Sequence, residues 1–235
     1  MQVGDTGREI SAVLLTTDVT TDVVNEAIML GCNLIISHHP LLFHGLKQVC
    51  GQTPQARIVE MAIKHDIAIY SAHTNLDSVS GGINTRLADL LGLAEQRILV
   101  PNGSSESWGL GIIGILGSPM HYLDFIAYVR KVLQCTYVRY TRPAKEMIQT
   151  VALCGGSGAE FIGTAIEQGA DVYLTADCKY HEFQDADGQI GLIDIDHWIS
   201  ERHAREIFRD ILAPLGLSVH ISQKDQTPIQ ILKIN

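Results

Sequence analysis

Short apolar runs that alternate with helical patterns dominate the first part of the chain. Residues 11–17 and 67–72 are apolar and rich in branched side chains, which is typical of strands buried on both faces. Thr20 and Thr21 precede a helical pattern that stops at Gly31, a residue suited to the left-handed end of a helix. Strands that alternate with helices of about 10 to 15 residues indicate βαβ units and a mostly parallel sheet.

The same reasoning extends to the rest of the chain. We expect further strands at 33–37, 149–153, 171–175, 190–195 and 217–221, and helices at 54–65, 83–91 and 200–212. Residues 99–148 read as a strand-helix-strand segment, with strands at 109–116 and 136–142 and a helix from about Met120. We therefore predict an α/β fold of two interleaved lobes with mostly parallel sheets. Residues 1–98 and 149–235 would form the main part, and 99–148 a smaller lobe.

Composition and charge narrow the class of protein. The chain has 235 residues, of which 46% are hydrophobic and 18% charged, as in an ordinary globular protein. No apolar run reaches the roughly 20 residues of a membrane span, and residues 1–5 lack a secretory signal, so we expect a cytoplasmic protein without membrane contact. A formal net charge of -9 disfavours nucleic acid as a general partner, although a local basic patch stays open. The 5 cysteines contain no Cys-x-x-Cys pair and are expected to be reduced, mostly buried thiols.

Histidines and carboxylates follow the predicted strands. His38 and His39 end one strand, His73 and Asp77 follow another, and His197 and Glu201 follow a third; a fourth group, residues 175–182, contains His181. The carboxyl ends of parallel strands meet at one edge, where ligands bind, so we expect these side chains to share a crevice at the strand ends between the lobes.

Imidazole and carboxylate together are the donor set of Zn, Fe or Mn. A carboxylate able to bridge suggests two ions, which would keep a positive charge and attract a small anionic or nucleotide-like substrate. A lone histidine is more often structural, and we read His65, His121, His203 and His220 that way. His181 stays open between lining the site and a structural role. The Gly155–Gly158 turn fits tight packing of helix on strand better than phosphate binding.

Several segments resemble one family. They are Leu-Ile-Ile-Ser-His-His-Pro at 34–40, Ser-Ala-His-Thr-Asn-Leu-Asp at 71–77, Cys-Gly-Gly-Ser-Gly at 154–158 and Asp-His-Trp-Ile-Ser-Glu at 196–201. These four segments, in this order, resemble those of the proteins related to Ngg-interacting factor three. Members of that family are dinuclear-metal-centre proteins and are often named GTP cyclohydrolase 1 type 2. The chain looks like the short form, without the central insertion of some relatives. Family members usually carry a helix and a Trp-Asp-Asn segment before the residues that match 2–5.

The resemblance implies a particular site. Five residues would hold two divalent ions on one rim of an α/β fold, with Glu201 bridging them: His38, His39, Asp77, His197 and Glu201. His73 and His181 would line the same cavity as catalytic residues. The resemblance also implies a homohexamer, described in the family as a toroid.

Two functional hypotheses follow. The leading one is a metal-dependent hydrolase of a nucleotide or small phosphorylated substrate, with water activated by the metal and a proton carried by His73 or His181. The family name suggests opening of the guanine ring of GTP, and phosphoester hydrolysis is the other reaction considered. The alternative is a metal-containing, ring-shaped adaptor that binds protein or nucleic acid without catalysis. Five ligands around two ions leave open coordination positions, which favours the hydrolase.

Overall fold

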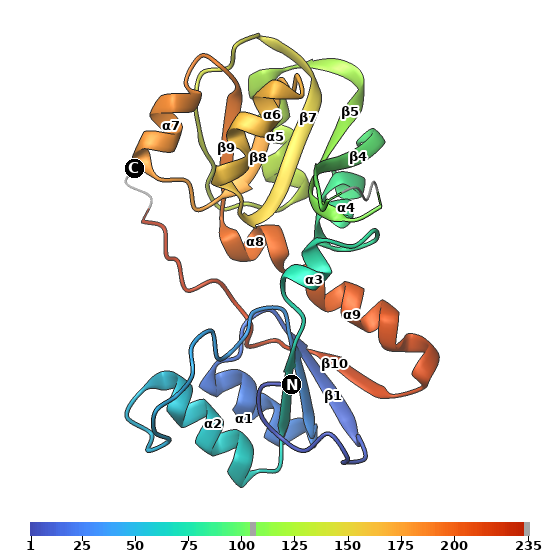
Figure 1. The fold of residues 1–235 in the computed structure, drawn as a ribbon, viewed down its shortest axis with the longest axis vertical. Helices are drawn as coiled ribbons and strands as arrows, with labels where there is room; N and C mark the ends of the chain where they lie inside the picture. Colours follow the sequence, from blue (N-terminus) through green and yellow to red (C-terminus); the bar gives the residue numbers. More distant parts are fainter. Residues whose placement is uncertain (104–106, 233–235) are drawn as a thin grey trace. The chain divides into compact units, whose positions relative to one another are not determined.

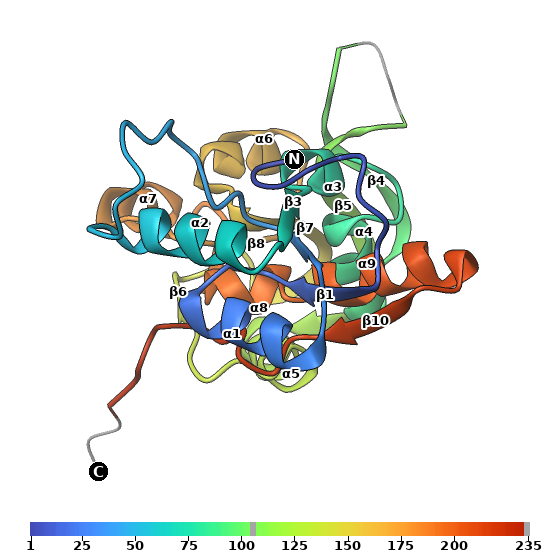
Figure 2. The same ribbon diagram turned by 90° about the horizontal axis from the view of Figure 1, so that it is seen from below.

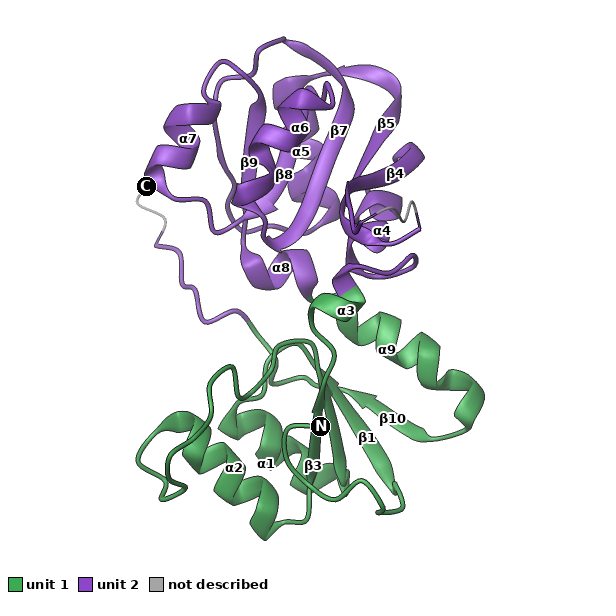
Figure 3. Ribbon diagram, in the orientation of Figure 1, with its two compact units in different colours: residues 1–76, 202–226 green, residues 77–201, 227–235 purple. Residues whose placement is uncertain are grey.

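The computed structural model describes residues 1–103 and 107–232, and it falls into two compact units (Figure 3). Unit 1 is Met1–Leu76 with Arg202–Gln226, and unit 2 is Asp77–Glu201 with Thr227–Asn235. The predicted α/β class is confirmed. These units have other bounds than the lobes expected from the sequence, because strands from 99–148 pair with strands from 149–195 in one sheet.

Unit 1 is built on a four-stranded parallel sheet, as far as the structure describes it. The strand order is β10 (Ser218–Ile221), β1 (Ala12–Thr16), β2 (Leu34–Ser37) and β3 (Ala68–Ser71). Helices α1 (Thr21–Leu30) and α2 (Pro54–Lys64) lie on one face and α9 (Ala204–Leu212) on the other (Figures 1 and 2). The apolar strand residues, such as Leu14, Ile35 and Ile69, are fully buried between these layers. The parallel sheet predicted for this part of the chain is confirmed.

Local signals in the sequence place the helix ends of unit 1 correctly. The Thr20 side chain accepts a hydrogen bond from the Val23 amide and caps α1, and Gly31 ends the helix with a φ of 68°. Thr53 caps α2 in the same way, with Pro54 at the first position. These ends depend on neighbours in the chain, which explains why they were predictable.

Unit 2 contains a six-stranded mixed sheet within the described residues. Its order is β4 (Ala94–Pro101), β5 (Gly109–His121), β7 (Met147–Ser157), β8 (Val172–Ala176), β9 (Gly191–Ile195) and β6 (Arg139–Tyr140). Only the β7–β8 and β8–β9 pairs are parallel. Helix α6 (Ile162–Glu167) and helix α5 (Tyr122–Val132) cover opposite faces (Figures 1 and 2). The mostly parallel arrangement therefore holds for unit 1, and the sheet of unit 2 is mixed.

The remaining elements are short. They are α3 (Thr74–Asp77), α4 (Ile83–Leu90), α7 (Tyr180–Ala186), α8 (His197–Glu201) and the 3-10 turns η1 (Ala159–Phe161) and η2 (Ala213–Leu215). The single helix expected at 200–212 is instead two helices, α8 and α9. Strand β4 was not predicted, because it is an edge strand with a short apolar run, Ile98–Val100, in which only Leu99 is buried. Across the described ranges, no helix has both the length and the apolar character needed to cross a bilayer.

Candidate metal-binding site

Three histidines of unit 1 gather where two neighbouring strands end. His38 and His39 follow β2 and His73 follows β3, and the parallel register sets Ser37 beside Ser71. The three side chains each offer a ring nitrogen, and these nitrogens lie within 4.8 Å of one another. Their ring centroids are 5.0 to 5.7 Å apart. Their convergence follows from the shared carboxyl edge of parallel strands.

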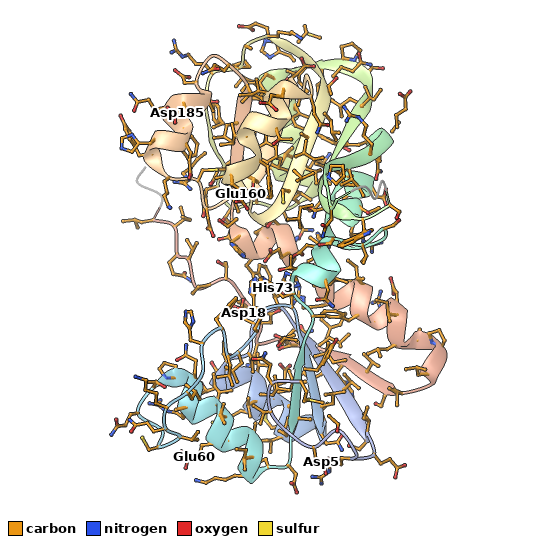
Figure 4. The ribbon with its side chains drawn as sticks, in the orientation of Figure 1. Asp5, Asp18, Glu60, His73, Glu160 and Asp185 are labelled. Carbon is orange, nitrogen blue, oxygen red and sulfur yellow. The ribbon has the colours of Figure 1, made fainter. Side chains whose placement is uncertain are left out.

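Hydrogen bonds fix the ring orientation of two of these histidines. The Nδ1 atom of His38 lies 3.0 Å from the Ala72 carbonyl oxygen, which can only accept, so Nδ1 is the protonated nitrogen. The Nδ1 atom of His39 lies 2.9 Å from the Asp18 carboxylate. Asp18 and His73 lie at the same end of unit 1 (Figure 4). A histidine that donates from one nitrogen to a carbonyl or carboxylate offers the other nitrogen to a metal, and this arrangement is typical of metal ligands.

The C-terminal part of unit 1 holds Asp18 in place. A carboxylate oxygen of buried Asp225 accepts from the Thr17 amide at 2.6 Å, and its other oxygen from the Asp18 amide at 3.4 Å. Arg205 lies 3.4 Å from the same carboxylate. Asp225, more than 200 positions away in the chain, thus orients the partner of His39.

In unit 2, β9 leads directly into α8. Asp196 accepts a hydrogen bond from the Ile199 amide at 3.2 Å and so starts this helix. Because residues four apart share a helix face, the Nε2 atom of His197 lies 2.8 Å from a Glu201 carboxylate oxygen. Its Nδ1 atom lies 2.7 Å from Asp177, which follows β8 with a left-handed φ of 58°.

The carboxylates of Glu201 and Asp177 favour a positive charge at His197. Burial lowers the pKa of His197, but the hydrogen bonds and charges of Glu201 and Asp177 outweigh burial and raise that pKa to about 9. The same electrostatic preference would be met by a metal cation in place of the proton. Sequence reasoning missed Asp177, for which only its position after a strand could have been a signal.

Gly156 leaves space for the Glu201 carboxylate because it has no side chain. Gly156 has a φ of +66°, and a Cβ atom there would stand 2.1 Å from an oxygen of Glu201. The Gly156 amide also donates to the hydroxyl of Ser200 at 2.8 Å. The neighbouring Gly155 amide donates to the side chain of Asn84 at 2.8 Å. The glycine turn therefore packs strand β7 closely against helices, as predicted from the sequence. It also shapes the group of candidate metal ligands.

Asp77 belongs to the same group in unit 2. The Asn84 side chain donates to the Asp77 carbonyl at 2.9 Å, and carboxylate oxygens of Asp77 and Glu201 lie within 4.8 Å of each other. Burial, and then the charges of Asp77 and Glu201, raise the pKa of the Cys154 thiol to about 12. Unit 2 thus contributes two carboxylates and one imidazole.

The predicted catalytic residues have different surroundings. His73 joins the histidine group of unit 1 and offers a nitrogen to it, so it is a further candidate ligand. His181 is exposed on α7, with Nδ1 3.4 Å from the side-chain oxygen of Gln184. Among the residues that the structure describes, it is part of no group suited to a metal ion. Its catalytic role stays a prediction.

The chain is similar to known proteins along most of its length. The family model Duf34/NIF3 (NGG1p interacting factor 3) matches residues 1–228. A Clostridium perfringens protein named GTP cyclohydrolase 1 type 2 homolog is 36% identical over 202 residues, covering 86% of this chain and 77% of its own length. The fold is similar to a crystal structure of a Staphylococcus aureus protein, with a TM-score of 0.90, 29% identity and coverage of 98% and 90%. A Bacillus cereus protein related to NIF3 also has a TM-score of 0.90, with 26% identity and coverage of 98% and 92%. The chain therefore belongs to the Duf34/NIF3 family.

Proposed function

We propose that this protein is a hydrolase that uses two divalent metal ions to act on a nucleotide or another small phosphorylated substrate. The observation that carries the proposal is the position of the two donor groups along the chain. The chain passes from unit 1 to unit 2 between Leu76 and Asp77, and back between Glu201 and Arg202. Donors thus stand directly at these two of the three crossings, and only residues 74–76 separate His73 from Asp77.

We assign five ligands to the two ions: His38, His39, Asp77, His197 and Glu201. Glu201 has two carboxylate oxygens and is the ligand assigned to both ions. The buried, oriented imidazoles and the nearby carboxylates suit Zn, Fe or Mn. Two carboxylates offset about half of the charge of two divalent ions, so the loaded site would attract an anionic substrate.

The ions, when bound, would lower the pKa of water and offset the charge that develops on the substrate. The protein residues have separate tasks. Asp18 and the Ala72 carbonyl hold the imidazoles of His39 and His38 in the ligating tautomer. His73, whose Nδ1 lies 3.3 Å from the Thr74 hydroxyl, would take up a proton at its other ring nitrogen. His181 is the second candidate for this proton transfer.

The relatives' names bear on the substrate. Several are named GTP cyclohydrolase 1 type 2 homolog, which supports a GTP-like substrate and an attack by water on a purine ring or a phosphoester. We also propose, from the family resemblance, that the protein assembles as a homohexamer in the cytoplasm.

Metal analysis tests the proposal first. We expect about two ions per wild-type chain by elemental analysis after incubation with Zn or Mn, and at most one in Glu201→Gln, because that change removes the ligand assigned to both ions. Glu167→Gln is the matched control, since Glu167 is an exposed carboxylate of unit 2, and it should keep the wild-type content. Circular dichroism would verify that both variants are folded.

Hydrolysis is then measured with the metal-loaded protein on GTP, other nucleotides and phosphoesters. A folded wild type that takes up no metal would contradict the whole proposal. Full metal content without turnover of any of these substrates would instead support the metal-containing adaptor.

A further inference from the structure

Unit 2 contains a cavity that is lined by none of the residues proposed above as metal ligands or proton carriers. Its volume is about 550 Å³, and it is bounded by the start of α5, by β6 with the turn after it, and by α7. Its walls include His121, Tyr122, Tyr140, Arg142, Tyr180 and Phe183. Small-molecule sites typically have volumes of about 300 to 1,000 Å³, with mostly apolar walls and a few polar groups, so this cavity has the size and lining of a ligand site.

Aromatic rings are concentrated there. Three of the chain's 7 tyrosines and one of its 5 phenylalanines line the cavity. Tyr122 is 2% exposed and donates to the Leu192 carbonyl at 3.3 Å, whereas Tyr140 and Tyr180 are 51% and 75% exposed. The rings of Tyr122 and Tyr140 meet at 76° with centroids 6.2 Å apart. Because Tyr122 is almost fully buried, a ligand in the cavity would contact the exposed rings of Tyr140 and Tyr180.

The charges of the cavity favour a cation. Arg142 is engaged by Asp187, whose two oxygens each lie 3.1 Å from its Nε atom. Glu146 lies 2.8 Å from His121, and apart from that histidine the walls carry one guanidinium against two carboxylates. A phosphate group would find its only guanidinium already paired. An ammonium ion gains from both the carboxylate and the electron-rich ring faces.

The protein itself already uses a ring of this cavity to bind a cation. The guanidinium of Arg139 lies over the ring of Phe183, 5.0 Å from its centroid. We propose that the cavity binds a small organic cation with an alkylated ammonium head group, which lies against the exposed rings of Tyr140 and Tyr180 near Glu146. This binding site is independent of the proposed hydrolase site.

Choline and its uncharged carbon isostere, 3,3-dimethylbutan-1-ol, are the probes that test the proposal. We would titrate each into the full chain carrying ¹³C-labelled tyrosine rings and follow the ring resonances by NMR. Choline is expected to shift the Tyr140 and Tyr180 signals and to bind about 5- to 30-fold more tightly than the isostere, because only choline gains cation–π attraction.

Three variants separate the contributions. Tyr140→Leu keeps an apolar side chain but removes the ring, and should weaken choline binding about 5-fold or more, whereas Tyr140→Phe should retain it. Glu146→Gln should weaken choline about 3-fold and leave the isostere unchanged. Glu167→Gln, outside the cavity, should change neither.

Equal binding of choline and its isostere would overturn the proposal in favour of a neutral apolar ligand. Absence of any shift at millimolar choline would also overturn it. If light scattering then showed self-association that protects Tyr180, the cavity would be an interface with a second copy of the chain.

Discussion

Single atoms decide what the histidine groups of this protein can bind. In His38 and His39 the Nδ1 atoms are engaged by a carbonyl and by Asp18, so Nε2 is the atom that would bind a metal in the proposed site. His197 has a carboxylate at each ring nitrogen and therefore retains positive charge. The three side chains are chemically identical in the sequence, and the fold gives their ring nitrogens different partners.

Gly156 provides a sharp test at this scale. Gly156→Ala adds a Cβ atom that would stand 2.1 Å from a Glu201 oxygen, so the carboxylate must move away. We expect a loss of metal affinity of at least about 10-fold, as is typical when ligand positioning is disturbed, together with about 1 to 2 kcal/mol of lost stability from the strained backbone. Metal competition with a chromophoric chelator and urea unfolding measure the two effects.

Gly169→Ala is the matched control. Gly169 has a φ of +78° and nothing within 4 Å of an added Cβ, so it carries the same backbone strain without a steric contact. It should lose similar stability and keep its metal affinity. Equal metal affinity in the Gly156→Ala and Gly169→Ala proteins would show that Gly156 does not control the position of Glu201.

At the scale of elements, short connections after strands carry most of the site chemistry. Helix α8 has only five residues, yet Asp196 starts it directly at the end of β9 and so brings His197 and Glu201 onto one face. The turn after β8 is fixed by buried Asp194, which accepts from the Cys178 amide at 2.7 Å and pairs with Arg139. That anchoring positions Asp177 beside His197.

A half-buried carboxylate, Asp171, ties two strands together and makes stability depend on pH. Burial alone would raise the pKa of Asp171, but hydrogen bonds from Lys145 and from the amides of Gln149 and Thr150 outweigh it, and the pKa is lowered. A lowered pKa means that the stabilisation is present above the unfolded value of about 3.9 and is lost as the pH falls through the folded value.

Asp171→Asn should therefore cost about 1 to 3 kcal/mol at pH 7, and the difference from wild type should shrink below about pH 4. Urea unfolding at several pH values measures it. Asp185→Asn, an exposed position on α7 (Figure 4), should change stability by less than about 0.5 kcal/mol. A deficit for Asp171→Asn that does not vary with pH would contradict the ionic explanation.

At the scale of the whole molecule, the exposure of each cysteine shows how tightly its surroundings are packed. Cys50 is exposed and the other four are buried, which confirms the expectation of mostly buried thiols. Burial raises the pKa of Cys32, Cys154 and Cys178, so these thiols hold little reactive thiolate at neutral pH.

One thiol per native chain should react rapidly with dithionitrobenzoate, and all five after unfolding in urea. Cys50→Ser should abolish the rapid phase and leave the slow one, whereas Cys135→Ser should leave the rapid phase intact. Two or more rapid thiols in the native wild type would contradict the burial of the remaining cysteines.

Much of the fold was predictable because it depends on near neighbours. The cap at Thr20, the glycine end of α1, the start of α2 at Pro54 and the parallel strands of unit 1 all follow from local pattern. The edge strand β4 and the break between α8 and α9 were missed, because neither changes the apolar periodicity. The antiparallel pairs of unit 2 were missed because strand direction depends on distant partners.

The sequence by itself determined the donor chemistry, the order of the donor segments and their place after strands. Those properties reside in residue type and spacing, which the chain carries before it folds. Only the tertiary structure decided that Asp18 and Asp225 support His39, that Asp177 faces His197 and that Gly156 makes room for Glu201. The aromatic cavity likewise joins segments between 121 and 187. Contacts between residues so far apart leave no periodic trace, so only the packed chain reveals them.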